Sequence, residues 1–289
     1  MTKADEGDDD PGAQADLGPF VQRILLGARL RAARESIELS STDATKALGW
    51  YAGKLSKIEW GDVPTSDKDL AAAIRAFKID PKEAGELQRL ASLARRKLPP
   101  SRVAEWAAKY VHLVAAAREL KLWYSDTFPG TVQTEDYARA QLERVVTVRP
   151  ADVEPMAQDR AKRVERLRAP GAPRLWLVVG EEALHRSIGG TDVLRGQLEQ
   201  VRDLAELENV SVQVMPFDAG AHASHGVSFS IVNLMEGRAG LVYVAGLTTS
   251  DYLGREHIRV YDLVFDKLRA DALSPQGTIE LINRRIAEL

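Results

Sequence analysis

The chain has 289 residues, of which 45% are hydrophobic and 28% are charged. This ordinary globular composition excludes a wholly disordered or fibrous protein, and the length favours two domains. The absence of cysteine excludes a disulfide scaffold, thiolate catalysis and any cysteine-ligated metal site. No apolar run approaches the roughly 18 to 20 residues of a membrane span, and the acidic start has no secretory signal. We therefore expect a cytoplasmic protein without a membrane partner.

The net charge of -3 is unevenly distributed along the chain. Residues 1–18 carry one base and six acids, residues 19–98 carry fifteen bases and ten acids, and residues 99–289 carry 23 bases and 26 acids. A basic block between two acidic ones favours a module that faces a polyanion. Residues 1–18 have almost no large apolar side chain, and we interpret them as a flexible acidic tail.

The basic block carries signals for five short helices. A first helix, from Pro19, has apolar residues at Leu26, Leu30, Ala33 and Ile37 on one face, and its other face carries arginines at positions 23, 31 and 34. Residues 40–43 resemble a capping box for a second helix, which Leu48 and Gly49 end. A third helix is expected over about 51–60, and Ser66 and Asp80 cap a fourth and a fifth. The tight glycine turn between the second and third helices predicts a helix-turn-helix domain over residues 19–98.

Residues 99–289 alternate between helical and strand signals. Strands are expected at 175–179 and 210–217, and a hairpin at 227–234 and 241–244. Amphipathic helices are expected between these strands, ahead of them and at the C-terminus. The expected fold class is therefore mainly α with a mixed α/β C-terminal domain, which we assign to dimerisation or sensing.

Two stretches of the chain resemble one class of known proteins. LSSTDATKALGWYAGKLSKIEWG, at residues 39–61, resembles the helix-turn-helix of lambda-repressor-like (XRE-family) regulators, through Leu48-Gly49, the run at 55–59 and Gly61. The C-terminal region resembles the partner domain of unknown function found in many actinobacterial regulators of this class. The matching stretches are FPGTVQTEDYARA at 128–140, the glycines at 189–190, QLE at 197–199, NVSVQVMPF at 209–217 and VYV at 242–244. The resemblance implies a DNA-binding transcriptional regulator.

The resemblance also implies which residues meet double-stranded DNA when the third helix enters the major groove. Those expected to contact phosphates are Ser41, Tyr51 and Lys54. Those expected in the first turns of the recognition helix and near base edges are Ala52, Gly53, Ser56 and Lys57. Glu59 is expected to be structural and to pin the turn from within the domain.

Two of the base-facing positions lack a hydrogen-bonding side chain. Ala52 stands where the family often has glutamine, and Gly53 follows it; glycine inside a helix also costs about 1 kcal/mol relative to alanine. A good bidentate contact contributes roughly 1–3 kcal/mol of discrimination. We therefore expect one domain to read sequence weakly, through Lys57, an apolar contact from Ala52 and DNA shape. In a homodimer two half-sites combine, which restores specificity.

The remaining clusters predict no catalytic site, no metal site and no cofactor. His222 and His225 lack the helical register of a zinc-binding HExxH motif, and we interpret them as incidental loop residues. Glu181 and Glu182 suit the first turn of a helix. The basic residues between positions 160 and 168 alternate with acids, which favours a solvated helix face.

Two alternatives to a simple regulator stay open. The first is an antitoxin-like interaction protein with weak DNA binding, because the resemblance implies that such regulators are often encoded beside a small protein partner. The second is an enzyme built on a degenerate regulator scaffold, although no nucleophile–base pair in the sequence supports it.

Overall fold

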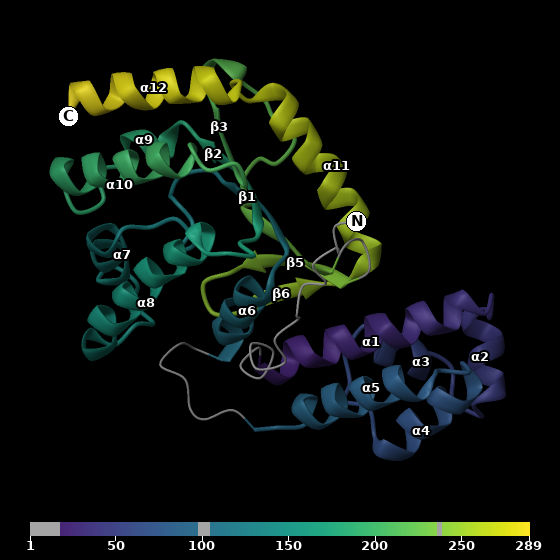
Figure 1. Cartoon of the computed structure of the whole chain (residues 1–289). Coiled ribbons are helices and arrows are strands. Elements are labelled where there is room, and N and C mark those ends of the chain that lie inside the picture. The colour runs from purple at the N-terminus through teal and green to yellow at the C-terminus, as the bar shows by residue number, and fades with distance from the viewer. Residues whose placement is uncertain (1–17, 98–104, 236–238) are drawn as a thin grey trace, which may run out of the picture. The chain divides into compact units, whose positions relative to one another are not determined.

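The computed structural model describes residues 18–97, 105–235 and 239–289 (Figure 1). The chain divides into two compact units, Met1–Pro100 and Ser101–Leu289, and each is described by itself. The acidic tail expected at residues 1–18 lies outside the described residues, except for Gly18, which is the first residue of a helix. The domain boundary expected between residues 98 and 99 also lies outside them.

Five helices build the first unit. The side chains of Ser40, Ser66 and Asp80 accept hydrogen bonds from backbone N–H groups in the first turns of the second, fourth and fifth helices. Each cap satisfies donors that the start of a helix otherwise leaves unpaired, and the expected starts of these helices are confirmed. The helices are α1 (Gly18–Ser36), α2 (Ser41–Ala47), α3 (Lys54–Glu59), α4 (Asp67–Ala76) and α5 (Pro81–Ala94).

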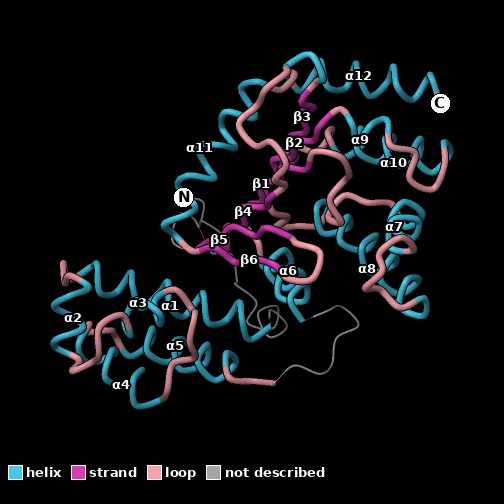
Figure 2. The backbone as a smooth tube through the Cα atoms, turned by 180° about the vertical axis from the view of Figure 1, so that it is seen from behind, coloured by secondary structure: helices cyan, strands magenta, loops and turns pink. Residues whose placement is uncertain are grey.

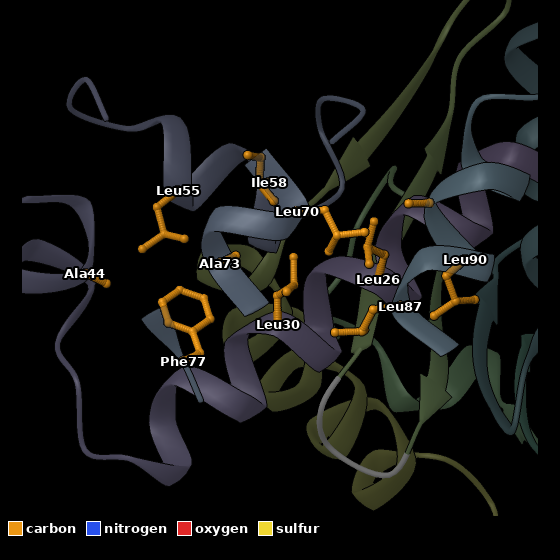
Figure 3. Close-up of a cluster of buried hydrophobic side chains, with 11 residues drawn as sticks. Leu26, Leu30, Ala44, Leu55, Ile58, Leu70, Ala73, Phe77, Leu87 and Leu90 are labelled. Atoms are coloured by element: carbon orange, nitrogen blue, oxygen red, sulfur yellow. The ribbon is translucent and has the colours of Figure 1, made fainter. Parts of the chain in front are cut away.

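Apolar side chains from all five helices converge in one core (Figure 3). Leu26 and Leu30 of α1 are buried as expected, but Ile37 was wrongly placed on the same face, because α1 ends at Ser36 and Ile37 is only partly buried. The remaining buried members come from the other four helices and from Phe77, the C-cap of α4: Ala44, Leu55, Ile58, Leu70, Ala73, Phe77, Leu87, Leu90 and Ala91. This core fixes α2 and α3 against α1, α4 and α5.

Gly27 lets α1 approach the C-terminal end of α3. A Cβ atom at Gly27 would collide with the backbone carbonyl oxygens of Ile58 and Glu59. Because these are backbone atoms, no side-chain rotation can make room, and only a shift of α3 relative to α1 would do so. A glycine inside the first helix is therefore a requirement of helix packing.

The second unit is built on one mixed sheet of six strands, in the order β3-β2-β1-β4-β5-β6 (Figure 2). β1, β2 and β3 run parallel, and the pairs β1–β4, β4–β5 and β5–β6 are antiparallel. The sheet therefore changes from parallel to antiparallel at β1. The strands are β1 (Glu119–Tyr124), β2 (Arg174–Gly180), β3 (Val210–Met215), β4 (Phe229–Met235), β5 (Ala239–Ala245) and β6 (Ser250–Leu253).

Helices cover both faces of this sheet, with α11 on one face and α6, α7 and α8 on the other (Figures 1 and 2). Trp123 of β1 and Phe229 of β4 pack with Phe265 of α11 in a buried cluster. The helices are α6 (Glu105–Ala116), α7 (Glu135–Leu142), α8 (Pro150–Arg168), α9 (Glu182–His185), α10 (Thr191–Leu204), α11 (Arg255–Asp271) and α12 (Pro275–Glu288), with a 3-10 turn at Phe217–Ala219. The expected mixed α/β fold of this region is confirmed.

Two strands were missed by the sequence reading. β1 was not expected at all, although it pairs with both β2 and β4 and carries the alternation Glu119-Leu120-Lys121-Leu122 that indicates a strand. β6 was not expected as a strand either, yet it forms the last strand of the sheet in the described residues.

Candidate nucleic-acid interface

The connection between α2 and α3 is a tight turn built on two glycines in the left-handed region. α2 ends at Ala47, and Gly49 (φ 64°) reverses the chain so that Trp50 N–H donates to the carbonyl oxygen of Thr45 at 3.0 Å. Gly53 (φ 85°) then forms the N-cap of α3. The short α2, the glycine turn and α3 make a helix-turn-helix.

The recognition helix is shorter than expected at its start. α3 begins at Lys54, so Tyr51, Ala52 and Gly53 lie on the turn before it and not in its first turns. The expected helix-interior penalty at Gly53 was wrong, because a positive φ favours glycine over any L-residue with a Cβ. The side chains presented by the exposed face of α3 itself are those of Ser56 and Lys57.

A buried ion pair anchors the C-terminal end of α3 to α1. The guanidinium of Arg34 donates to both carboxylate oxygens of Glu59, with Nε–Oε1 at 2.6 Å and Nη2–Oε2 at 2.9 Å. Its remaining Nη1 donates to the carbonyl oxygen of Leu39 at 2.8 Å. Arg34 is 6% exposed and Glu59 is 5% exposed, and the hydrogen bond to Glu59 raises the pKa of Arg34. Glu59 is thus structural, as expected.

Arg31 and Arg34 were wrongly expected on the solvent face of α1. Both are buried, and the guanidinium carbon of Arg31 lies 4.5 Å from the ring centroid of Trp60. Trp60 therefore packs on a cation of its own unit.

Among the predicted contact residues in the described structure, Lys54 is the one whose side chain is hydrogen-bonded to another side chain. Its Nζ donates to Oδ1 of Asp69 at 2.7 Å and lies 4.7 Å from the ring centroid of Trp50. Burial acts to raise the pKa of Asp69, but its hydrogen bonds from Lys54 and Ser66 outweigh that effect and lower the pKa overall. Contact between Lys54 and a phosphate would therefore compete with Asp69.

The other six predicted contact residues are exposed: Ser41, Tyr51, Ala52, Gly53, Ser56 and Lys57. The ammonium group of Lys57 makes no ion pair with any described residue. The exposed fraction of Tyr51 is 63%. Lys46, in the last turn of α2, is a further exposed lysine that the sequence reading did not single out.

The loop histidines of the second unit bond to their own loop. Nδ1 of His222 accepts from the N–H of Ser224 at 3.2 Å, and Nε2 of His225 accepts from the N–H of His222 at 3.1 Å. Within the described ranges no group of three metal-ligating side chains comes together. Glu181, just before α9, accepts a hydrogen bond from the N–H of Phe217 at 2.8 Å.

The basic residues of α8 do not form the solvated face that was expected. Lys162 and Arg168 are exposed, but Arg160, Arg163 and Arg166 are partly buried. Nη1 of Arg160 donates to the side-chain oxygens of two glutamines, at positions 133 and 141, at 2.8 Å and 2.6 Å. The interpretation was wrong because the sheet and α6 cover one side of α8, which the alternation of charges does not reveal.

Residues 107–284 match the family model described as domain of unknown function (DUF5753), and residues 25–87 match a model described as helix-turn-helix domain. The first match covers more than half of the chain, and the second contains α2, the turn and α3. A comparison with curated proteins and with solved structures found no match. In the described part of the chain, no helix has the length and apolar character to span a membrane.

Proposed function

We propose that this chain, which belongs to the family defined by the domain of unknown function DUF5753, is a transcriptional regulator that binds double-stranded DNA. The helix-turn-helix match points to a DNA-binding regulator rather than to an enzyme. In this proposal the helix-turn-helix is of the lambda-repressor-like (XRE) class, residues 19–98 bind DNA as part of a homodimer, and residues 99–289 dimerise and sense.

The observation that carries the proposal is an exposed polar surface on a rigid support. The inner side of α3 is fixed by Leu55, Ile58 and the Arg34–Glu59 pair, all buried. Its outer side presents Ser56 and Lys57, which are exposed. A helix held this way suits the major groove, where it must present a few side chains to base edges in a fixed orientation.

The start of α3 changes how the contacts divide in the proposal. Ser56 and Lys57 lie on the helix and contact bases, whereas Ser41 and Tyr51 contact phosphates. Ala52 and Gly53 lie on the turn, where Ala52 gives an apolar contact to a thymine methyl group. This division leaves Lys57 as the main source of discrimination between base pairs.

A mobility-shift titration on the DNA flanking the gene tests this function. Lys57→Gln should reduce the preference for that DNA over a scrambled duplex by roughly 1–3 kcal/mol, the discrimination that one good base contact supplies. The matched control is Lys82→Gln, which removes an exposed lysine of α5 outside the helix-turn-helix and should leave the preference unchanged.

The salt dependence of the same titration provides a second readout. Affinity should fall steeply as salt is raised, because neutralised phosphates release counterions. Absence of binding at low salt would rule out the DNA-binding proposal. Equal losses in Lys57→Gln and Lys82→Gln would show that the binding is nonspecific attraction to the basic unit.

Protein–protein contact through the second unit is the companion proposal. α11 exposes Val260 (58%) and Leu263 (59%), three residues apart and therefore neighbours on the helix surface. This apolar pair favours an interface, in a homodimer or with a small protein encoded nearby in an antitoxin-like arrangement. Sedimentation measurements of the molecular mass of the wild type and of Val260→Asp distinguish the homodimer from the complex with a small protein. A dimer that becomes monomeric supports self-association, whereas a wild-type monomer that co-purifies with a neighbouring small protein supports the antitoxin-like role.

A further inference from the structure

The partly buried arginines of α8 place their charged groups in different surroundings. A cavity of about 220 Å³ lies between α6, α8 and β1, and the side chains of Arg163 and Arg166 contribute to its lining. Because the surface of this cavity is almost entirely apolar, the nitrogens of the two arginines do not face it. Nη2 of Arg166 donates instead to the carbonyl oxygen of Ala117 at 3.0 Å, and its Nε is enclosed without a partner in the described structure. The donors of Arg163 therefore lie outside the cavity.

The donors of Arg160 and Arg163 are open to solvent and mostly unused. The guanidinium of Arg163 makes no hydrogen bond or ion pair with any described residue, and Arg160 uses only its Nη1. In the described part of α8, only Arg166 has a side-chain nitrogen that lacks a partner and is also closed to solvent. The unused nitrogens of Arg160 and Arg163 therefore keep contact with solvent, although both residues are partly buried.

The two guanidinium groups meet beside Gly130, in the loop between β1 and α7. A Cβ atom at Gly130 would lie 3.4 Å from Nε of Arg160 and 3.5 Å from Nη1 of Arg163. Glycine thus leaves a point without a side chain that both nitrogens border. The loop leads into α7, which packs beside α8 (Figures 1 and 2). A single ligand placed at this point can reach both cations.

Two glutamines hold Arg160 in this position. Its Nη1 donates to Oε1 of Gln133 at 2.8 Å and to Oε1 of Gln141 at 2.6 Å. Gln133 is buried, and its Nε2 donates to the carbonyl oxygen of Phe128 at 2.7 Å. Because both partners are neutral, they orient the guanidinium without cancelling its charge. Nε and Nη2 of Arg160 remain available for a ligand.

No carboxylate of the described structure neutralises the two arginines. Asp159 is the acid whose charge acts on Arg163, but it is exposed and makes no ion pair with it. Burial lowers the pKa of Arg163, and burial followed by the charge of Arg163 lowers the pKa of Arg160 to about 10. The two like charges therefore share a desolvated location without a counter-ion from the chain.

The remaining polar neighbours of the pair are hydroxyl groups. Tyr124 of β1 is close enough to Arg160 to affect its pKa, and Tyr110 of α6 affects that of Arg163. The hydroxyls of Tyr110 and Tyr124 lie 3.0 Å and 3.4 Å from Oγ of Ser230. Burial raises the pKa of Tyr110 well above its ordinary value, so this hydroxyl stays neutral. The surroundings of the two cations are thus polar but offer no negative charge.

Desolvated cations without a counter-ion are unfavourable in a folded protein, and perturbed charges that remain accessible gather at binding sites. We propose that Arg160 and Arg163 bind the phosphate group of a small molecule, seated beside Gly130. A phosphate monoester carries about 1.5 to 2 negative charges at neutral pH, which matches the two cations, whereas a carboxylate neutralises only one. Guanidinium groups suit phosphate because their parallel N–H groups donate to two oxygens at once. This binding does not rest on the proposed DNA-binding function.

Isothermal titration calorimetry on the full chain, without DNA and in a buffer free of phosphate and sulfate, tests the site. The probes are inorganic phosphate and phenyl phosphate, with benzoate as the singly charged counterpart of phenyl phosphate. We expect saturable one-to-one binding of at least one phosphate, and roughly tenfold or more weaker binding of benzoate, because one cation is left unpaired. Tighter binding of phenyl phosphate than of inorganic phosphate indicates an organic phosphate ester as the ligand. Equal affinities indicate that the phosphate group alone is recognised.

Two variants and a matched control locate the binding. Arg163→Gln removes a cation that has no partner in the described structure and should weaken phosphate binding roughly tenfold or more. Gly130→Leu should block the site without removing a charge, because its Cβ takes the point between the two guanidinium groups at ordinary contact distances. Arg168→Gln removes an exposed arginine of the same helix and should bind as the wild type does. A thermal melt of each variant confirms that it is folded.

Three results would overturn the proposal. The first is no binding of either phosphate at millimolar concentration. The second is equal phosphate binding by the wild type and by a folded Arg163→Gln. The third is binding of benzoate as tight as that of phenyl phosphate, which would contradict the match between two cations and a doubly charged group. Failure of DNA binding in the mobility-shift titration leaves all three readouts intact.

Discussion

Arg34 in the first unit is buried and Arg163 in the second is partly buried, and of the two only Arg34 makes an ion pair with a carboxylate of the described structure. The bidentate bond to Glu59 holds α1 and α3 together, whereas the guanidinium of Arg163 makes no hydrogen bond or ion pair with a described residue and only its side chain contributes to the lining of an apolar cavity. Removing one member of a buried ion pair leaves the other charge uncompensated, whereas replacing a charge that has no partner leaves no such charge behind. The contrast separates an arginine with a structural partner from one without a partner in the described structure, although both lie on long helices.

The largest expected effect breaks the pair in the first unit. Arg34→Met leaves the Glu59 carboxylate buried without a partner and should destabilise that unit by about 3–5 kcal/mol. The double variant Arg34→Met/Glu59→Met should recover most of the loss, because no uncompensated charge remains. Denaturant unfolding of the full chain, with hydrogen exchange to assign the unit that opens, measures both. A loss below about 1 kcal/mol would place the pair in the class of surface ion pairs.

The packing beside this pair gives the next largest effect. Gly27→Ala places a methyl group against the carbonyl oxygens of Ile58 and Glu59 and should destabilise the first unit by about 1–3 kcal/mol. Gly85→Ala is the matched control, because nothing lies within 4 Å of its Cβ position in α5. That control should stabilise the unit by about 0.4–1 kcal/mol. If thermal unfolding gives stability changes of the same sign for Gly27→Ala and Gly85→Ala, the close contact between α1 and α3 is contradicted.

Arg163 should respond in the opposite direction from Arg34. Arg163→Met removes a desolvated charge that has no partner in the described structure, so the free energy of unfolding should be unchanged or higher by up to about 1 kcal/mol. The same denaturant experiment measures this free energy of unfolding. A strong destabilisation would mean that Arg163 has a structural role comparable to that of Arg34, and the contrast between the two units would disappear.

The smallest effect concerns Asp69, which holds Lys54. Its pKa is lower in the folded chain than the ordinary value of 3.8, so the unfolded state takes up the proton first as the pH falls. The stabilisation is therefore complete above about pH 5 and is lost as the pH falls through the lowered folded-state pKa. Asp69→Asn should remove this dependence and change stability by less than about 1 kcal/mol, because the pair is partly exposed.

The same variant bears on DNA binding. With Asp69 neutral, Lys54 is free to meet a phosphate, so the salt slope of DNA binding should steepen by about 0.9. Lys54→Gln should flatten it instead or leave it unchanged. An unaltered slope in Asp69→Asn would exclude Lys54 from the phosphate contacts and would restrict the interface to the exposed residues.

The helices of the first unit were predictable because their signals are local. Ser40, Ser66 and Asp80 cap helices through atoms two or three residues away, and such spacing is visible in sequence. The start of α3 was misplaced because Gly53 was interpreted as a helix interior residue, whereas its positive φ is a property of the turn. The exposed residues around α3 were found, but the bond between Lys54 and Asp69 was not, because it joins two different helices.

The second unit was harder because its signals are long-range. β1 was missed although Glu119 and Lys121 alternate with leucines, and Nζ of Lys121 donates at 2.7 Å to Asp262, on a helix far along the chain. The cavity could not be predicted either. Which arginines of α8 are partly buried depends on how α8 packs within the unit, and β1, a central strand of that unit, was not predicted.

The placement of Tyr51 and Ala52 on a turn has a consequence for how such a protein evolves. Neither residue belongs to the core cluster or to a helix, so both can be replaced without disturbing helix propensity or packing. The residues that hold the scaffold and the turn residues that we propose as DNA contacts are thus different sets. Under the proposed function, related genes can change these two contacts while inheriting the same supporting architecture.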